Sequence, residues 1–214
     1  MPTTPRLSPT RRQTCVLILA AAASPASAAR RKVVTILGDS ITAGYGLPAA
    51  QALAAQLERA LAMIGAPAAV RGSGVSGDTT GGGLARVAFS VQSDTDLCVV
   101  ALGGNDLLQG LDPTVTKANL MHIVAWLKAR RIGVLLAGLR APAAIGADYA
   151  RDFNAVFPAV AKSQAVALYP DLLAGVEGMR ALNQGDGIHP NAAGTALIAR
   201  CMAPVVAHGL NARP

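Results

Sequence analysis

Charged residues are scarce in this chain of 214 residues, because Asp, Glu, Lys and Arg together make up 14% of it. An average globular domain carries about 25% of them. Aromatic residues are scarcer still at 3%, so the sequence lacks a set of rings on which successive nucleobases could stack. Uninterrupted apolar runs of the roughly 18 residues that span a membrane are also missing, so no transmembrane segment is expected. A hydrophobic content of 52% excludes a disordered chain.

The N-terminal segment has the features of a secretory signal. Three arginines precede the apolar run 15–23, and the small-residue triplet Ala26-Ser27-Ala28 follows it. This order predicts a signal peptide over residues 1–28 and therefore a periplasmic or secreted protein. The adjacent Arg11 and Arg12 leave the choice between the Sec and Tat export routes open.

The net charge of +7 is concentrated at the same end of the chain. Three basic residues lie in the predicted leader, and Arg30, Arg31 and Lys32 follow it directly. From Val33 onward 13 basic residues are matched by 12 acidic ones, so no basic stripe is left for a polyanion. We therefore expect no nucleic-acid partner.

Cysteine is almost absent, with three residues in the chain. Cys15 lies in the predicted leader, Cys98 in an apolar run typical of a strand, and Cys201 in a helical pattern. We interpret the last two as small buried thiols, since free cysteine is among the most buried residue types. A disulfide between them stays open in an exported protein. No cysteine or histidine spacing typical of a metal site is present, so no metal is expected.

Apolar runs that end in small residues alternate with segments of helical periodicity. This alternation predicts a parallel sheet covered by helices on both faces, in a single domain over residues 33–210. Strands are predicted over residues 33–37, 68–71, 97–102, 133–139 and 165–168. Helices are predicted over 49–64, 80–91, 148–162 and 191–208, with a further helix that begins at residue 113.

Small and polar residues follow the first three predicted strands and precede the last helix. The four loops are 38–40, 74–78, 103–106 and 186–190. Because the carboxyl ends of parallel strands meet at one edge of a sheet, we expect the side chains of these loops to lie together.

The residue types in these loops suit nucleophilic acyl transfer. Asp186 lies three residues before His189, where its carboxylate can orient the imidazole as a base. Ser40, in the Gly-flanked turn after the first strand, is the candidate nucleophile. The backbone N–H groups of Ser40 and Gly77 and the side-chain amide of Asn105 can stabilise an oxyanion. Taken singly, each of these residues could instead serve as a helix cap or a turn residue.

Two other motifs compete for the interpretation of the same loops. Residues 72–77 match the G-x-G-x-x-G pattern of dinucleotide-binding turns. The acidic residues Asp94 and Asp96 precede the next strand, whereas a ribose-binding acid should follow it. The G-x-S-x-G elbow of the α/β-hydrolases is not completed by Ser40, Ser73 or Ser76. Both alternatives are therefore disfavoured.

Taken together, the four loops resemble the four sequence blocks of the SGNH hydrolases, also called GDSL lipases/esterases. The resemblance is strongest to exported bacterial arylesterases, acyl-CoA thioesterases and lysophospholipases, and it covers essentially the whole mature chain. Ile41 stands where the family's name has leucine. The matching residues are Gly38-Asp39-Ser40-Ile41, Ser76-Gly77-Asp78-Thr79, Gly103-Gly104-Asn105-Asp106 and Asp186-Gly187-Ile188-His189-Pro190.

The resemblance implies a three-layer α/β/α, flavodoxin-like fold with a five-stranded parallel sheet. It implies that Ser40 is the nucleophile, His189 the base and Asp186 its orienting partner, and that Ser40, Gly77 and Asn105 form the oxyanion hole. These are the roles that the residue chemistry suggests independently. The resemblance also implies that neither a metal nor an organic cofactor is needed.

The sequence therefore predicts a serine hydrolase that cleaves small-molecule carboxylic esters and thioesters, and a monomer is expected. Three leucines after the Asn105 loop are candidates to line an acyl groove, although they could equally anchor that loop in the core. These are Leu107, Leu108 and Leu111. A carbohydrate acetylesterase on the same fold and a non-catalytic binding module remain the alternatives.

Overall fold

Five parallel strands form one sheet in the order β2-β1-β3-β4-β5. The computed structural model describes residues 1–4 and 30–212, and the predicted signal peptide lies outside the described residues apart from its first four. The strands are β1 (Lys32–Gly38), β2 (Ala68–Gly74), β3 (Leu97–Ala101), β4 (Gly133–Ala137) and β5 (Ala167–Tyr169). This strand order is that of flavodoxin-like sheets, so the predicted fold class is confirmed.

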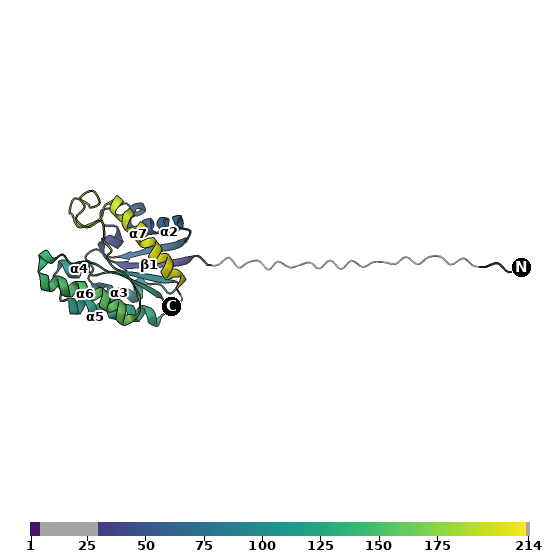
Figure 1. Ribbon diagram of the computed structural model, residues 1–214, viewed down its shortest axis with the longest axis horizontal. Coiled ribbons are helices and arrows are strands. Elements are labelled where there is room, and N and C mark those ends of the chain that lie inside the picture. The colour runs from purple at the N-terminus through teal and green to yellow at the C-terminus, as the bar shows by residue number, and fades with distance from the viewer. Residues whose placement is uncertain (5–29, 213–214) are drawn as a thin grey trace. The chain divides into compact units, whose positions relative to one another are not determined.

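Helices cover both faces of this sheet (Figure 1). Helices α2 and α7 pack together on one face, whereas α3, α5 and α6 pack side by side on the other. The helices are α1 (Ser40–Ala43), α2 (Leu53–Met63), α3 (Thr80–Ser90), α4 (Gly104–Leu108), α5 (Pro113–Ala129), α6 (Ala147–Gln164) and α7 (Ala192–Asn211), with short 3-10 turns η1 (Ala49–Gln51) and η2 (Ala143–Ile145).

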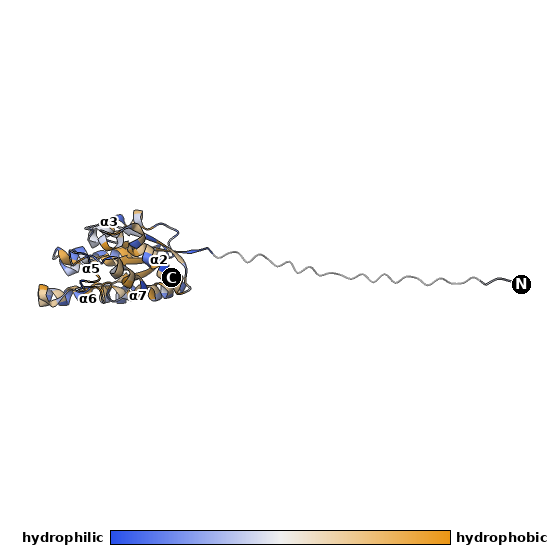
Figure 2. Cartoon of the chain, turned by 90° about the horizontal axis from the view of Figure 1, so that it is seen from above, coloured by the Kyte–Doolittle hydropathy of each residue, from blue (hydrophilic) through white to orange (hydrophobic). Residues whose placement is uncertain are grey.

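Burial on both faces explains the apolar strands and the low charge content of the chain. Every residue of β3 is buried, and β1 is buried from Val33 to Gly38. Figure 2 shows the hydrophobic residues gathered on the strands between the helices. A sheet of this kind needs nearly continuous runs of Val, Ile and Leu, and it leaves few positions for charge.

The element boundaries differ from the sequence-based ones at two informative places. The helix predicted over 49–64 is broken at Ala52, whose extended backbone (φ −64°, ψ 155°) separates η1 from α2. The last strand begins at Ala167 rather than at Ala165, because Ala165 adopts a left-handed φ of 52° and ends α6. Neither conformation leaves a mark in hydrophobic periodicity.

The two cysteines of the described residues are free, and the predicted burial is wrong for one of them. Cys98 is buried in β3 as expected, but Cys201 is exposed. Cys201 lies on the outer side of α7, whereas the neighbouring Ala199, Met202 and Ala203 face the core. A small apolar residue in an apolar helix can occupy either side, so periodicity alone did not place it.

Helix α7 is long and apolar enough, by length and composition, to cross a membrane. In this fold it packs against α2 and against strands β3, β4 and β5. Seven of its residues, from Gly194 to Val206, are buried. Its apolar composition is therefore that of a helix that covers one face of the sheet.

Candidate active site

Ser40 lies at the junction between β1 and α1, at the carboxyl edge of the sheet. The Asp39 side chain caps α1 by accepting a hydrogen bond of 3.0 Å from the N–H of Ile41. A Cβ on Gly38 would lie 2.9 Å from the carbonyl oxygen of Ala101 and would overlap the Thr42 side chain. Only glycine therefore allows β1 to end so close to its neighbours, with Ser40 as the first residue of the helix.

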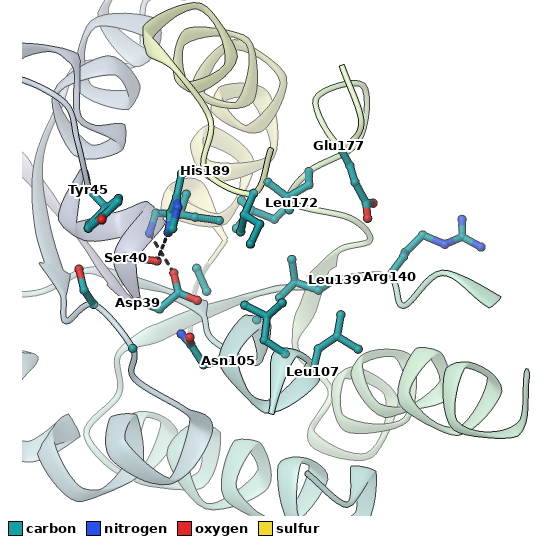
Figure 3. A pocket seen from close by; sticks show the side chains of 18 of the residues that line it. Asp39, Ser40, Tyr45, Asn105, Leu107, Leu139, Arg140, Leu172, Glu177 and His189 are labelled. Carbon is teal, nitrogen blue, oxygen red and sulfur yellow. Dashed lines mark hydrogen bonds between the residues drawn. The ribbon is translucent and has the colours of Figure 1, made fainter. Parts of the chain in front are cut away.

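His189 and Asp186 belong to the loop before α7 and lie beside Ser40 in space. The Ser40 Oγ is 2.9 Å from His189 Nε2, across 149 residues of sequence. The Asp186 Oδ2 is 2.6 Å from His189 Nδ1, which completes a line of three polar groups. Figure 3 shows the imidazole of His189 directed at Ser40. This arrangement can take a proton from a serine hydroxyl.

The loop geometry keeps the Asp186 carboxylate aimed at the imidazole. Its Oδ1 accepts the backbone N–H groups of Ile188 at 2.9 Å and His189 at 3.0 Å. The hydrogen bond from the His189 ring, followed by these two backbone N–H groups, lowers the pKa of Asp186 to about 2. Asp186 is therefore ionised at any pH near neutrality and can stabilise an imidazolium.

The two further oxyanion candidates border the same cavity as Ser40. Gly77 has a φ of 85°, a conformation that favours glycine, and a Cβ there would meet nothing within 4 Å. The backbone angle, rather than close packing, therefore requires glycine at this position. The Asn105 Nδ2 donates one hydrogen bond of 2.9 Å to the carbonyl of Asp78. An amide NH2 has two hydrogens, so one is left for a ligand.

A cavity of about 370 Å³ adjoins these groups, and most of its large side chains are apolar. Leu107 and Leu108 border it as expected. Leu111 does not line it; its carbonyl instead accepts a hydrogen bond of 2.9 Å from the Tyr149 hydroxyl. The chain turns away after α4, where the N–H of Leu111 bonds to the carbonyl of Asp106.

Several residues of the cavity were not anticipated from the sequence. The ring of Tyr45 lies 4.5 Å from the ring of His189, centre to centre. Leu139 and Arg140 follow β4, and Leu172 and Glu177 come from the long loop after β5. The position of Leu139 could have been anticipated, because it follows a buried strand and therefore lies at the same carboxyl edge of the sheet as the other loops. The part of the loop after β5 that precedes Asp186 carries no recognisable motif.

Asp39 is the one carboxylate of the cavity that is almost fully buried, at 5% exposure. Burial, which disfavours the charged form, raises the pKa of Asp39 to about 6 despite the hydrogen bond from Ile41. Asp39 therefore changes its charge near pH 6.

This shift predicts a pH-dependent stability that Asp39→Asn should remove. The native state holds the proton of Asp39 more tightly than the unfolded chain, whose carboxyl has a pKa of 3.8. The contribution of Asp39 to the unfolding free energy should thus fall as the pH rises from about 4 to 6, by up to about 3 kcal/mol. The unfolding free energy of Asp39→Asn relative to wild type should increase by that amount between pH 4 and pH 7, measured by urea titration.

Asp112→Asn provides the matched control with the opposite sign. Asp112 caps α5, and hydrogen bonds from the Thr114 backbone and hydroxyl lower its pKa. Its variant should therefore lose stability relative to wild type as the pH rises through 4. A difference between wild type and Asp39→Asn that stays constant with pH would contradict the buried titration.

Within residues 30–212, no group of three or more His, Cys, Asp or Glu side chains is placed to hold a metal ion.

The chain is similar to proteins of known family. Residues 36–197 match the model of the GDSL-like Lipase/Acylhydrolase family. The chain is 39% identical to esterase TesA of Pseudomonas aeruginosa over 163 residues, which are 76% of this chain and 81% of the relative. It is 37% identical to thioesterase 1/protease 1/lysophospholipase L1 of Escherichia coli over 186 residues, which are 85% and 88% of the two chains.

A solved structure is also similar. The crystal structure of AlinE4, described as an SGNH-hydrolase family esterase, superposes with a TM-score of 0.70 at 40% sequence identity. The match covers 85% of this chain and 98% of AlinE4. The family match over residues 36–197 includes the loops that carry the candidate residues.

Proposed function

Because the chain belongs to the GDSL-like lipase/acylhydrolase family, we propose that it hydrolyses carboxylic esters and thioesters through an acyl-enzyme on Ser40. The observation that carries this proposal is the line of polar groups from Asp186 through His189 to Ser40, with separations of 2.6 and 2.9 Å. The proposed activity is of the arylesterase, acyl-CoA thioesterase and lysophospholipase type.

In the acylation step, the Ser40 Oγ attacks the carbonyl carbon of the substrate while its proton passes to His189 Nε2. The carbonyl oxygen becomes an oxyanion, and the N–H groups of Ser40, Gly77 and Asn105 stabilise it. Asp186 holds the Nδ1–H of the imidazole and stabilises the imidazolium. When the tetrahedral intermediate collapses, the bond to the alcohol or thiol breaks, and the leaving group takes the proton from His189.

Deacylation repeats the same steps with water as the nucleophile. His189 accepts a proton from water, and the resulting hydroxide adds to the acyl carbon of the ester on Ser40. The oxyanion again lies among the same donors. Breakage of the bond to Ser40 Oγ releases the carboxylic acid, and the proton on His189 returns to the serine.

The cavity supports an acyl group longer than acetate. Leucine side chains from α4, from the end of β4 and from the loop after β5 border the space beside Ser40, and contact with a methylene chain removes apolar surface from water. An acetyl group would leave most of this surface without a partner. The residues are Leu107, Leu108, Leu139, Leu172 and Leu173.

A substrate series tests the proposal. We expect kcat/KM to rise from p-nitrophenyl acetate to butyrate and octanoate, by up to about fourfold per methylene, since each buried methylene contributes about 0.8 kcal/mol. Butyryl-CoA and octanoyl-CoA report on thioesters, and acetylated xylan reports on acetyl-sugar substrates. A rate that is highest for xylan would favour the carbohydrate acetylesterase, and no turnover of any ester would favour a binding module.

A further inference from the structure

A guanidinium lies behind the oxyanion candidates, outside the cavity. Arg86, on α3, has a side chain only 17% exposed. Its Nη2 donates to the carbonyl of Gly38 at 2.7 Å, and its Nη1 donates to the carbonyl of Ser73 at 3.0 Å. Its Nε donates to the carboxylate of Asp78 at 2.5 Å. One side chain therefore contacts the ends of β1 and β2 and the loop that follows β2.

Asp78 connects two of the candidate oxyanion donors. It follows Gly77 directly, and its N–H closes the turn around Gly77 by donating to the carbonyl of Val75 at 3.1 Å. Its own carbonyl accepts the 2.9 Å hydrogen bond from Asn105 Nδ2. A Cβ on Gly82 would lie 2.9 Å from the carboxyl carbon of Asp78, so glycine there lets the carboxylate approach α3. Any displacement of Asp78 would move both Gly77 and Asn105.

The Gly38 carbonyl links Arg86 to the third donor. Gly38 lies two residues before Ser40, and its carbonyl also accepts the N–H of Val75 at 3.1 Å. The hydrogen bond from Arg86 therefore fixes the end of β1 relative to the Gly77 loop. All three oxyanion candidates, from three separate loops, are therefore connected to this guanidinium: Gly77 and Asn105 through Asp78, and Ser40 through Gly38.

We propose that Arg86 is a positioning residue, which sets the mutual geometry of the Ser40, Gly77 and Asn105 donors without contacting the substrate. It also neutralises the Asp78 carboxylate, whose negative charge would otherwise oppose the oxyanion that develops near Gly77. The planar fork of arginine suits this role, because lysine could pair with Asp78 but could not serve several acceptors in fixed directions. The inference rests on the proposed acyl-enzyme mechanism.

Arg86→Met tests this role, with Arg71→Met as the matched control. We expect Arg86→Met to lower kcat for p-nitrophenyl butyrate by about 100-fold with little change in KM, because misplaced donors affect the transition state and not the bound ester. Arg86→Lys should recover part of kcat. Arg71, on β2, also pairs with a carboxylate, Asp94, at 2.6 Å, but lies outside the residues that line the cavity. Its variant should keep kcat within twofold of wild type.

A tetrahedral inhibitor separates positioning from general destabilisation. A boronic acid forms an anionic adduct with an active serine, so its Ki should rise in Arg86→Met in parallel with the loss of kcat. Urea titrations at the assay temperature verify that every variant is folded under the conditions of the kinetic measurements. In the double variant with Asp78→Asn, the loss of kcat should be smaller than the product of the two single losses, since both act on the same loop.

The outcomes distinguish this inference from the proposed function. If folded Arg86→Met keeps kcat and the boronate Ki within twofold of Arg71→Met, the positioning role is wrong, even when Ser40→Ala is inactive. If Ser40→Ala keeps its activity, the acyl-enzyme mechanism itself is wrong. Should Arg86→Met fail to fold, Arg86→Lys and Asp78→Asn are compared with Arg71→Met instead. An unchanged kcat in both variants would overturn the inference.

Discussion

Ser40→Ala should lower kcat for p-nitrophenyl butyrate by about 10⁴-fold or more while leaving the protein folded. The variant removes the atom that forms the acyl-enzyme, and the methyl group of alanine cannot take its place. Ser40 is 9% exposed, and its Oγ lies 2.9 Å from His189 Nε2. The substitution removes only this oxygen, so we expect it to lower kcat and to change the packing little. Steady-state kinetics at substrate saturation measure the effect, and urea unfolding verifies the fold.

Ser76→Ala is the control for this comparison. Ser76 borders the same cavity but lies in the loop after β2, and no hydrogen bond joins its side chain to His189 among the described residues. Its kcat should remain within a few fold of wild type. A fluorophosphonate should label wild type and Ser76→Ala at Ser40, located by peptide mass spectrometry, but not Ser40→Ala. Activity that survives in Ser40→Ala, or a label on another serine, would show that the nucleophile is misassigned.

Asp106→Ala should cost about 3–5 kcal/mol of unfolding free energy, the largest stability effect that we expect from a single polar residue here. Asp106 is fully buried and accepts the backbone N–H of Thr80 at 2.7 Å and the Thr116 hydroxyl at 3.0 Å, as well as the Thr80 hydroxyl. Thr80 and Thr116 are fully buried too. Without the carboxylate, these donors lose their acceptor in a place that water does not reach.

Asp106→Asn and Asp112→Ala serve as comparisons in the same urea titrations. Asparagine keeps one oxygen acceptor, so Asp106→Asn should lose less stability than Asp106→Ala. Asp112 is an exposed cap of α5, and its replacement should have a much smaller effect, because water can replace the lost hydrogen bonds. If Asp106→Ala lost no more stability than Asp112→Ala, the buried carboxylate would not be holding α3, α4 and α5 together.

The alternation of elements could be predicted from the sequence because burial has a local signature. Strands β1 and β3 are buried on both faces and therefore appear as continuous apolar runs. Helices α5 and α6 carry buried residues at helical spacing. The start of β5 was misplaced and the break at Ala52 was missed, since both depend on backbone angles that apolar periodicity does not encode.

The candidate catalytic groups could also be anticipated from their loops. Asp186 and His189 are three residues apart, so their contact is local and the spacing alone suggested it. Ser40 was suggested by its place after a buried strand. The environment of these groups was not predictable: the ring of Tyr45 against His189, the burial of Asp39 and the hydrogen bonds of Arg86 all depend on segments that meet only in the folded chain.

The sequence by itself determined the alternation of strands and helices and the family to which the chain belongs, because both can be recognised from short, continuous stretches of residues. Only the tertiary structure decided that Ser40 and His189, 149 residues apart, lie 2.9 Å from each other. It also decided that Leu107 and Leu108 border the cavity whereas Leu111 does not, and that Cys201 faces outward. The physical reason is the same in each case. These positions depend on strand register and loop length, and the types of the contacting residues do not reveal either of them.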